Sequence, residues 1–273
     1  MSKHSPKSMK RYINANINPK IIIYIMVTIT PICMMAAYYW ARAEGHLIRP
    51  FTNGRISCSP EEIALYSYIY SAFIGGCASV SATMRYLPES FILHAMFSLD
   101  AVLIAITFFF FKPWLLELNK YSDNPFKKIN LHASIIMWAG ILGGLFFLIS
   151  TSMWNGRHVY DIYLGPVNVG DWHAILAYTF CSLILLSSLY FTIVEYKLRK
   201  STLFSKGYKI CFSIRILSFV TFIAIFSVVI GTLIINKKLK ILNAGLEYWM
   251  IHIFILWYIS FIFDKKFFNK FNN

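Results

Sequence analysis

Long apolar runs, separated by short polar and basic segments, dominate the hydropathy pattern of this chain. A helix needs about 20 mostly apolar residues to cross the hydrocarbon core of a bilayer, where every backbone polar group must be paired within the protein. Seven runs approach this length: Ile21–Trp40, Ile63–Met84, Phe91–Phe111, Leu131–Met153, Trp172–Val194, Ile210–Ile235 and Leu246–Phe263. The pattern therefore predicts an all-α polytopic membrane protein whose helices form one bundle.

The basic residues indicate how many of these runs cross the membrane completely. Lys and Arg gather on the cytosolic side of membrane proteins. If all seven runs cross, the Lys197–Lys209 cluster and the basic C-terminal tail fall on the lumenal side. If Phe91–Phe111 does not cross completely, both lie in the cytosol with the N-terminus, and Asp100 avoids the lipid. We therefore predict six transmembrane helices, with seven as the alternative.

This topology divides the chain into three parts. Residues 1–20 form a basic N-terminus, residues 21–264 the transmembrane bundle, and residues 265–273 a basic tail, with both ends in the cytosol. The loops are short, and neither a linker nor an internal repeat is visible. The pattern therefore predicts one domain without a soluble catalytic module.

The composition agrees with a membrane protein and changes the interpretation of the charge. Of the 273 residues, 58% are hydrophobic and 14% are charged, whereas soluble domains average roughly 45–50% and about 25%. The formal net charge of +14 would suggest nucleic acid in a soluble protein. Here the basic residues lie between apolar runs, where they signal topology and contact anionic headgroups. We therefore expect membrane lipids, and not nucleic acid, as partners.

Common catalytic and metal-binding motifs are missing from the sequence. The five cysteines include no CxxC pair, so neither a zinc site nor a disulfide framework is indicated. There is no GxSxG elbow, Walker loop or HExxH helix. We therefore expect neither a cofactor nor a metal ion.

Four ionisable residues in the apolar runs are the candidates for chemistry, because polar groups in hydrocarbon are costly. His94 and Asp100 lie six residues apart in one run, about 120° apart on a helix, so they do not share one face. His173 opens another run, where an imidazole can shuttle a proton or bind a headgroup phosphate. Glu247 opens the last run, where the helix dipole favours a carboxylate.

Structural roles explain part of the same pattern. Asp171 and Glu247 suit a helix start as caps. Arg215, about one turn inside a run with a basic flank, is expected to extend to the cytosolic headgroups. His94 and Asp100 can form a packed structural pair. The residues alone leave these alternatives open.

Four short motifs occur in a defined order along the chain. They are Pro50-Phe51 with Ser59-Pro60-Glu61, then Met84-Arg85-Tyr86, then Gly170-Asp171-Trp172-His173-Ala174, and finally Leu246-Glu247-Tyr248 in a run that ends at Phe263-Asp264. From Ile21 to Phe267 the chain resembles the FRAG–DRAM–Sfk superfamily, and most of all the branch of post-GPI-attachment-to-proteins factor 2. Two departures are Thr52-Asn53-Gly54-Arg55 in place of Ser-Asp-Thr-Gly, and Lys265 in place of an aromatic residue after Asp264.

The resemblance implies a multi-pass protein of the Golgi or endoplasmic reticulum membrane that takes part in lipid remodelling of GPI-anchored proteins. In this branch the step is reacylation of lyso-GPI, so GPI-anchored proteins or lyso-GPI intermediates are the implied partners. Our hypothesis is that candidate catalytic residues from different helices line a polar pocket near the lumenal leaflet, where a His with a carboxylate acts as general base for acyl transfer: His173, Glu247, His94 and Asp100.

Two other classes of function remain open at this point. The DRAM and Sfk branches suggest a non-enzymatic regulator of autophagy or of lipid asymmetry. A transporter is disfavoured, because inverted repeats and paired broken helices are not visible in the sequence. Whether the chain itself catalyses an acyl transfer is left open by the sequence.

Overall fold

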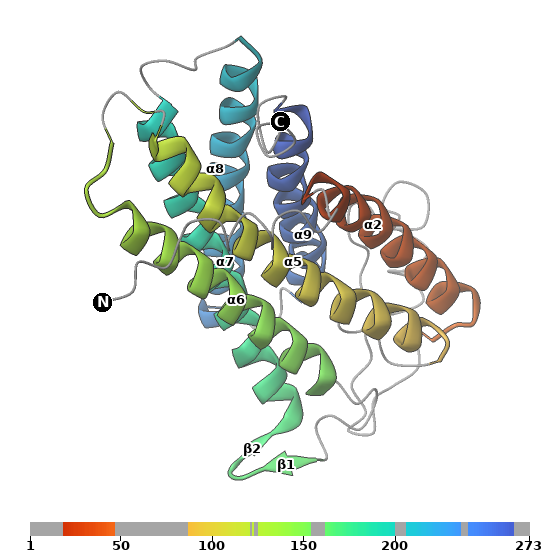
Figure 1. Ribbon diagram of the computed structural model, residues 1–273. Helices are drawn as coiled ribbons and strands as arrows, with labels where there is room; N and C mark the ends of the chain where they lie inside the picture. The colour runs from red at the N-terminus through yellow and green to blue at the C-terminus, as the bar shows by residue number, and fades with distance from the viewer. Residues whose placement is uncertain are drawn as a thin grey trace.

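The computed structural model describes residues 19–46, 87–120, 122, 125–153, 162–199, 206–235 and 240–264, although not the side chains of residues 206–207, 229–230, 232–235 and 240–248. Within these ranges the chain forms helices and one short β-hairpin (Figure 1). The elements are α2 (Pro19–Ala43), α5 (Glu89–Lys120), α6 (Ile129–Met153), β1 (Tyr163–Leu164), β2 (Val167–Asn168), α7 (Val169–Arg199), α8 (Lys206–Ile235) and α9 (Lys240–Phe263). The predicted all-α bundle is confirmed.

The helices have the length and apolar character of membrane spans. In the described part of the chain, α2, α5, α6, α7 and the 208–228 portion of α8 are each long and apolar enough to cross a bilayer. A shorter apolar stretch, Trp249–Phe263, belongs to α9, whose full length is 24 residues. Because about 20 residues suffice to cross, this chain is a multi-pass membrane protein.

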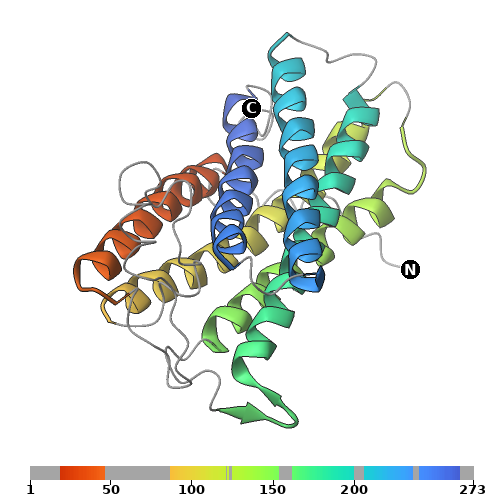
Figure 2. The same ribbon diagram turned by 180° about the vertical axis from the view of Figure 1, so that it is seen from behind.

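Contacts between helix ends show which ends lie together. Lys20 Nζ donates to the Asp264 carbonyl oxygen at 3.1 Å, which places the start of α2 beside the end of α9. Arg199 at the end of α7 lies 3.0 Å from the Asp264 carboxylate. At the opposite end, His46 after α2 lies 2.5 Å from Glu89 in the first turn of α5. Consecutive described helices therefore run in opposite directions (Figure 2).

We name the two ends of the bundle by the helix termini that they contain. The basic end contains the starts of α2, α6 and α8 and the ends of α5, α7 and α9, and the hairpin end contains the opposite termini and the β-hairpin (Figures 1 and 2). In the sequence, Lys and Arg are dense in the segments that contain or adjoin these helix termini, namely residues 1–20, 120–128, 197–209 and 265–273. The positive-inside rule therefore predicts that the basic end faces the cytosol.

The structure corrects the expectation that Phe91–Phe111 stops short of crossing. This run is the centre of α5, a continuous helix of 32 residues, which is about 48 Å long at 1.5 Å per residue. Asp100 argued against crossing because a lipid-facing carboxylate is costly, but its side chain is buried against protein. The predicted span Ile63–Met84 lies outside the described residues. The described helices nevertheless leave Pro19 and Asp264 at the same end, as the six-span topology requires.

Tags fused to the two ends of the chain are both expected to be accessible from the cytosol, because residues 19 and 264 lie together at the basic end. Antibody staining after permeabilising only the plasma membrane measures this. A tag inserted between Gly165 and Pro166, in the turn of the β-hairpin, is the matched control and should stain only after the internal membranes are opened. Opposite accessibility of the two terminal tags would contradict the arrangement.

The β-hairpin, which the sequence did not predict, fixes the start of α7. Its two strands pair in antiparallel register, with Gly165 in the turn at a φ of 69°, a conformation that glycine adopts at little cost. The Asn168 side chain then caps α7, because its Oδ1 accepts the Asp171 N–H at 2.8 Å. Asp171 accepts from Asn168 Nδ2 at 2.7 Å. Asn168, and not Asp171, is therefore the cap, and Asp171 supports it from the third helical position.

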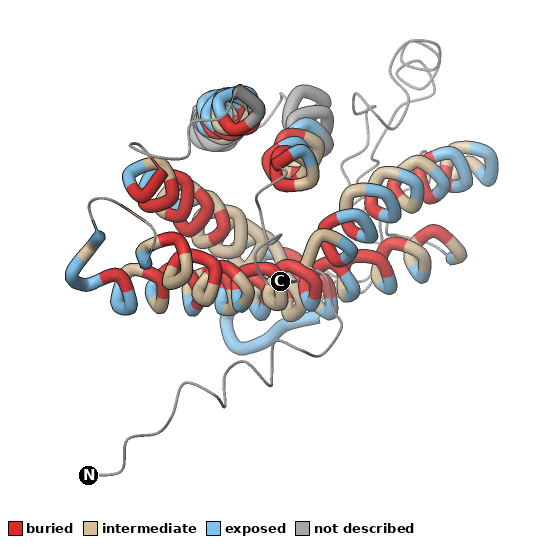
Figure 3. Tube along the Cα trace, turned by 45° about the horizontal axis from the view of Figure 1, so that its top comes forward, coloured by how far each residue is buried: buried red, intermediate tan, exposed pale blue. Residues whose placement is uncertain are grey.

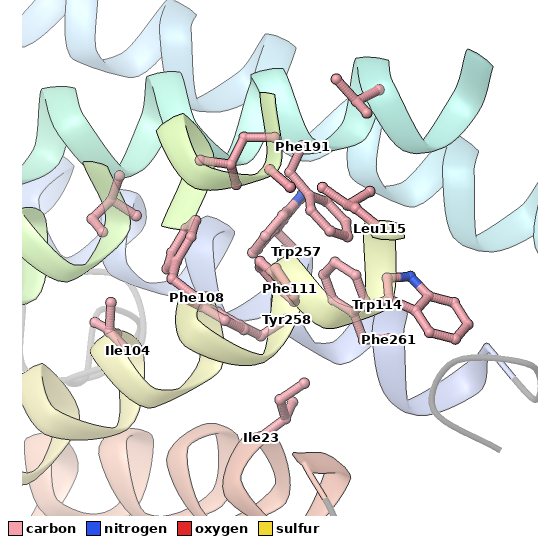
Figure 4. Close-up of a cluster of buried hydrophobic side chains, with 14 of the residues drawn as sticks. Ile23, Ile104, Phe108, Phe111, Trp114, Leu115, Phe191, Trp257, Tyr258 and Phe261 are labelled. Carbon is pink, nitrogen blue, oxygen red and sulfur yellow. The ribbon is translucent and has the colours of Figure 1, made fainter. Parts of the chain in front are cut away.

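Aromatic side chains fill the centre of the bundle (Figure 4). Phe111 of α5 stacks on Phe191 of α7, with ring centroids 4.1 Å apart, and packs against Phe261 of α9 at 5.4 Å. Trp257 of α9 packs against Phe261 at 4.8 Å, and its indole N–H reaches Thr192 Oγ1 at 3.3 Å. Buried positions follow the inward side of the helices and exposed ones the outer side (Figure 3). Part of the unusually high Phe content thus serves the core and not the lipid face.

Helices α5 and α6 approach closely because small residues lie between them. A Cβ atom added at Gly144 would lie 2.7 Å from the Ala101 carbonyl oxygen and 3.2 Å from Ala105 Cβ. The first contact is with backbone, which cannot turn aside as a flexible side chain would. Small residues at such crossings let membrane helices pack closely, where dispersion replaces the hydrophobic effect as the source of attraction.

Replacing Gly144 by alanine is therefore expected to destabilise the folded protein by about 1–3 kcal/mol, the usual cost of overpacking. Gly231→Ala in α8 is the matched control, because an added Cβ there meets no atom within 4 Å, and it should be neutral or stabilising by up to about 1 kcal/mol. Thermal unfolding of the purified variants in detergent measures both effects. Equal stability of the two variants would show that the α5–α6 crossing tolerates separation.

Candidate functional site

His173 lies at the hairpin end, held between α6 and α7. Its Nδ1 is 2.8 Å from the carbonyl oxygen of Ser150 and 3.2 Å from the Ser150 hydroxyl. The same hydroxyl donates to the carbonyl oxygen of His173 at 3.0 Å. Ser150 is buried and His173 half-buried. The imidazole is therefore fixed in position by two contacts to one residue of the neighbouring helix.

The Ser150 carbonyl also determines the tautomer of the imidazole. A carbonyl oxygen only accepts hydrogen bonds, so Nδ1 must carry the hydrogen that joins the two groups. In the neutral ring the lone pair then belongs to Nε2, the nitrogen that would take up a proton. His94 of α5 lies within electrostatic range of His173. Two of the predicted site residues, His94 and His173, are thus brought near one another, together with Ser150, which the sequence did not indicate.

Asp100 lies elsewhere in the bundle, 12 residues into α5, and faces α2. Its Oδ2 is 2.8 Å from the hydroxyl oxygen of Thr30. Cys33 of α2 and Tyr258 of α9 lie within electrostatic range of the carboxyl group. The described contacts of Asp100 therefore join α5 to α2, and they place this residue in a different polar group from His173.

Glu247 does not open the last helix. The helix begins at Lys240, and its first turn contains no acidic residue. Because the dipole acts within the first turn, it does not explain Glu247, and the predicted role as a cap is wrong. The Glu247 side chain lies outside the described side chains, so its place in the predicted pocket stays a prediction.

The free N–H groups at the starts of α7 and α9 could also bind a headgroup phosphate, and the structure bears on this possibility. At α7 the Asp171 N–H already bonds to Asn168, so the protein itself uses part of this helix terminus. At α9 the start lies at Lys240, seven residues before Glu247. The proton chemistry of His173 therefore has more structural support than a phosphate cradle at the two helix starts.

A second polar group, at the basic end, was not among the sequence candidates. It consists of Glu195 and Arg199 of α7, Arg215 of α8 and Asp264 after α9, and we call it the ionic cluster. The side chains are buried, with at most 3% exposed. Arg199 lies 2.9 Å from Glu195 and 3.0 Å from Asp264. Arg215 pairs with Glu195 and lies 3.7 Å from Asp264.

Neighbouring side chains also contact the ionic cluster. Arg215 Nε donates to Ser260 Oγ at 2.7 Å, and its guanidinium lies 3.7 Å from the centre of the Phe261 ring. The Arg199 guanidinium lies 4.3 Å from the centre of the Tyr208 ring. Buried charges are tolerated when they are paired and further contacted in this way. Two arginines and two carboxylates cancel formally, so the cluster joins three helices without leaving a net charge.

The prediction that Arg215 extends to the headgroups is wrong, because its side chain has no exposed surface. Glu195 and Arg199 were overlooked because the apolar run ends at Val194, before Glu195, and because Arg199 was counted with the basic cluster Lys197–Lys209. The sequence did contain one local indication of this pair, because a Glu four residues before an Arg on a helix forms a favourable ion pair. The partners on α8 and after α9 depend on the tertiary fold.

Among the described residues, no group of three or more His, Cys, Asp or Glu side chains could hold a metal ion. A third polar contact lies at the hairpin end, where Glu89 is buried and meets His46. This contact joins the end of α2 to the start of α5. It therefore holds together the described residues on either side of residues 47–86.

Comparison with known families decides the family of this chain. The model of the Frag1/DRAM/Sfk1/Cwh43P N-terminal domain family matches residues 18–266. The chain belongs to this family. The match covers all the described helices. The His173 group and the ionic cluster therefore both lie inside the matched region. Neither a curated protein nor a solved structure matches the chain significantly.

Proposed function

We propose that this Frag1/DRAM/Sfk1 family protein is a Golgi or endoplasmic reticulum membrane factor in the lipid remodelling of GPI-anchored proteins, acting at the reacylation of lyso-GPI. The family match and the motif around His173 support this assignment. The main structural support for a base at this site is the contact of His173 Nδ1 with the Ser150 carbonyl oxygen. This contact leaves Nε2 as the basic nitrogen of the ring.

Reacylation forms an ester bond between an acyl carbon and the free glycerol hydroxyl of lyso-GPI. The bond from the acyl carbon to its donor, an ester or a thioester, breaks in the same reaction. A base must take the hydroxyl proton as the new bond forms, and the departing group must receive a proton. His173 Nε2 is suited to both transfers, because its ring is held by Ser150 and the proton passes through one nitrogen.

The depth of the site supports a lipid substrate. His173 is the fifth residue of α7, at the hairpin end of the bundle. Under the positive-inside rule this end faces the lumen, and GPI anchors lie in the lumenal leaflet. The ester region of a lyso-GPI molecule would therefore meet the bundle near the His94, Ser150 and His173 level. Glu247 retains its proposed role of orienting His173 or a substrate hydroxyl.

The proposal is tested by deleting the gene and analysing GPI anchors by mass spectrometry, with surface retention of GPI-anchored proteins measured in parallel. Loss of the protein should make lyso-GPI accumulate and should lower surface retention, and re-expression of the intact chain should reverse both. Unchanged anchor lipids would reject the remodelling role. A defect in autophagy or in lipid asymmetry with normal anchors would favour a regulator of the DRAM or Sfk type.

A further inference from the structure

One of the four buried carboxylates among the described residues has an unusual environment. Three of the four lie beside a nitrogen-bearing side chain: Glu89 beside His46, Glu195 beside Arg199 and Arg215, and Asp264 beside Arg199. The fourth, Asp100, is 4% exposed, and its described partner is the hydroxyl group of Thr30. Among the described residues, Asp100 has no nitrogen-bearing partner of the kind that the other three carboxylates have.

The contacts of Thr30 limit where the hydrogens of this group can lie. Its hydroxyl oxygen is 2.7 Å from the carbonyl oxygen of Met26 and 2.8 Å from Asp100 Oδ2. Both distances are those of good O–H···O hydrogen bonds. A hydroxyl group carries one hydrogen, and the Met26 carbonyl can only accept. Donation from Thr30 to the carbonyl four residues earlier is a common arrangement in helices. The hydrogen between Thr30 and Asp100 is then left for Asp100 to supply.

The other described groups that interact with Asp100 do not provide a positive charge. Cys33 on α2 and Tyr258 on α9 interact with it electrostatically, and neither is a cation. The Tyr258 side chain is completely buried, and its hydroxyl has no hydrogen-bond partner among the described residues. An isolated ionised carboxylate is strongly disfavoured in such surroundings, and in proteins the group is neutralised instead.

We propose that Asp100 is a proton-binding site, protonated in the resting protein, with its carboxyl O–H donating to Thr30 and Thr30 donating to the Met26 carbonyl. This inference does not depend on the GPI function. It also gives Thr30 two states. When the proton leaves Asp100, the Thr30 hydroxyl can turn from Met26 and donate to the new carboxylate.

Infrared spectroscopy of the purified full-length protein in lipid vesicles tests this site directly. The wild-type spectrum minus that of Asp100→Asn should contain the C=O stretching band of a carboxylic acid, shifted to lower frequency after exchange into heavy water. If the difference instead contains the paired stretching bands of an ionised carboxylate, the proposal is overturned. That result would mean that one Thr30 hydrogen is shared between Met26 and Asp100.

A second pair of variants keeps the test decisive if Asp100→Asn does not fold. Thr30→Val removes the acceptor and should move the acid band to higher frequency, because a weaker hydrogen bond leaves a stiffer C=O bond. Thr30→Ser keeps the hydroxyl and should leave the band unchanged. If no acid band responds to Thr30→Val, Asp100 does not donate to Thr30 and the assignment is wrong.

Discussion

Replacing Arg215 by methionine is expected to lower the free energy of unfolding by about 3–5 kcal/mol, the usual cost of removing one partner from a buried ion pair. Arg215 contacts Glu195 and donates to Ser260, and neither it nor Glu195 has exposed surface. Without Arg215, two carboxylates share one arginine, so the ionic cluster keeps a net negative charge inside the bundle. Denaturation of the purified variant in mixed micelles measures the loss.

The matched control is Lys209→Met, which also replaces a cation by methionine, in the same helix at an exposed position. It should alter the free energy of unfolding by less than about 1 kcal/mol, as expected of an exposed charge. Glu195→Gln added to Arg215→Met removes one charge of each sign and should recover part of the stability. Wild-type stability of Arg215→Met would mean that this arginine reaches water, as the sequence had suggested.

The length and apolar character of the runs predicted the helices well, because the thickness of the hydrocarbon core imposes both. The run Leu131–Met153 differs from α6 by two residues at its start. The largest differences occur where a helix continues beyond the hydrocarbon core. Thus α7 extends past Val194 to Arg199, and α5 extends past Phe111 to Lys120. Hydropathy stops at the last apolar residue, whereas backbone hydrogen bonding continues through the polar turns.

Charge patterns gave a correct expectation for a partly wrong reason. The six-span topology placed both ends of the bundle on one side, and the described helices do so. However, the run Phe91–Phe111 was predicted to stop short, because this count placed the basic clusters in the cytosol and because Asp100 was judged as though it faced lipid. Its burial against Thr30 depends on how α2 packs on α5. No property of a single run contains that information, because the partner lies 70 residues away in sequence.

The sequence predicted the histidines of the candidate site, but it did not predict the residues that contact them. His173 stood out because a histidine is unusual at the start of an apolar run. Ser150 did not stand out, since a lone serine is common in membrane helices, and the atom that fixes the imidazole is a backbone carbonyl. The ionic cluster was missed because charged residues in basic flanks are usually topology signals. Only the packing of α7, α8 and α9 turns them inward.

His173→Ala is expected to reduce the rescue of GPI-anchor reacylation in a deletion line by a factor of about 10²–10⁴, the usual contribution of a general base. The loss of its contacts to Ser150 should cost stability by only about 0.5–1.5 kcal/mol per hydrogen bond, so the variant should still be made and reach its membrane. The measurements are the ratio of lyso-GPI to reacylated GPI by mass spectrometry and the amount of folded protein by size-exclusion fluorescence.

Ser150→Ala is the matched control, because it removes the hydroxyl and keeps the carbonyl that receives the His173 Nδ1 hydrogen. If the imidazole is a base oriented by that carbonyl, Ser150→Ala should retain most of the rescue although it loses a similar number of side-chain contacts. If His173 only joins α6 to α7, both variants should lose stability, and each should rescue in proportion to the folded protein that remains.

Glu247→Gln, which removes the charge and keeps the shape, should abolish rescue only if that carboxylate orients His173 or the substrate. Full rescue by both His173→Ala and Glu247→Gln would mean that neither residue takes part in the reaction.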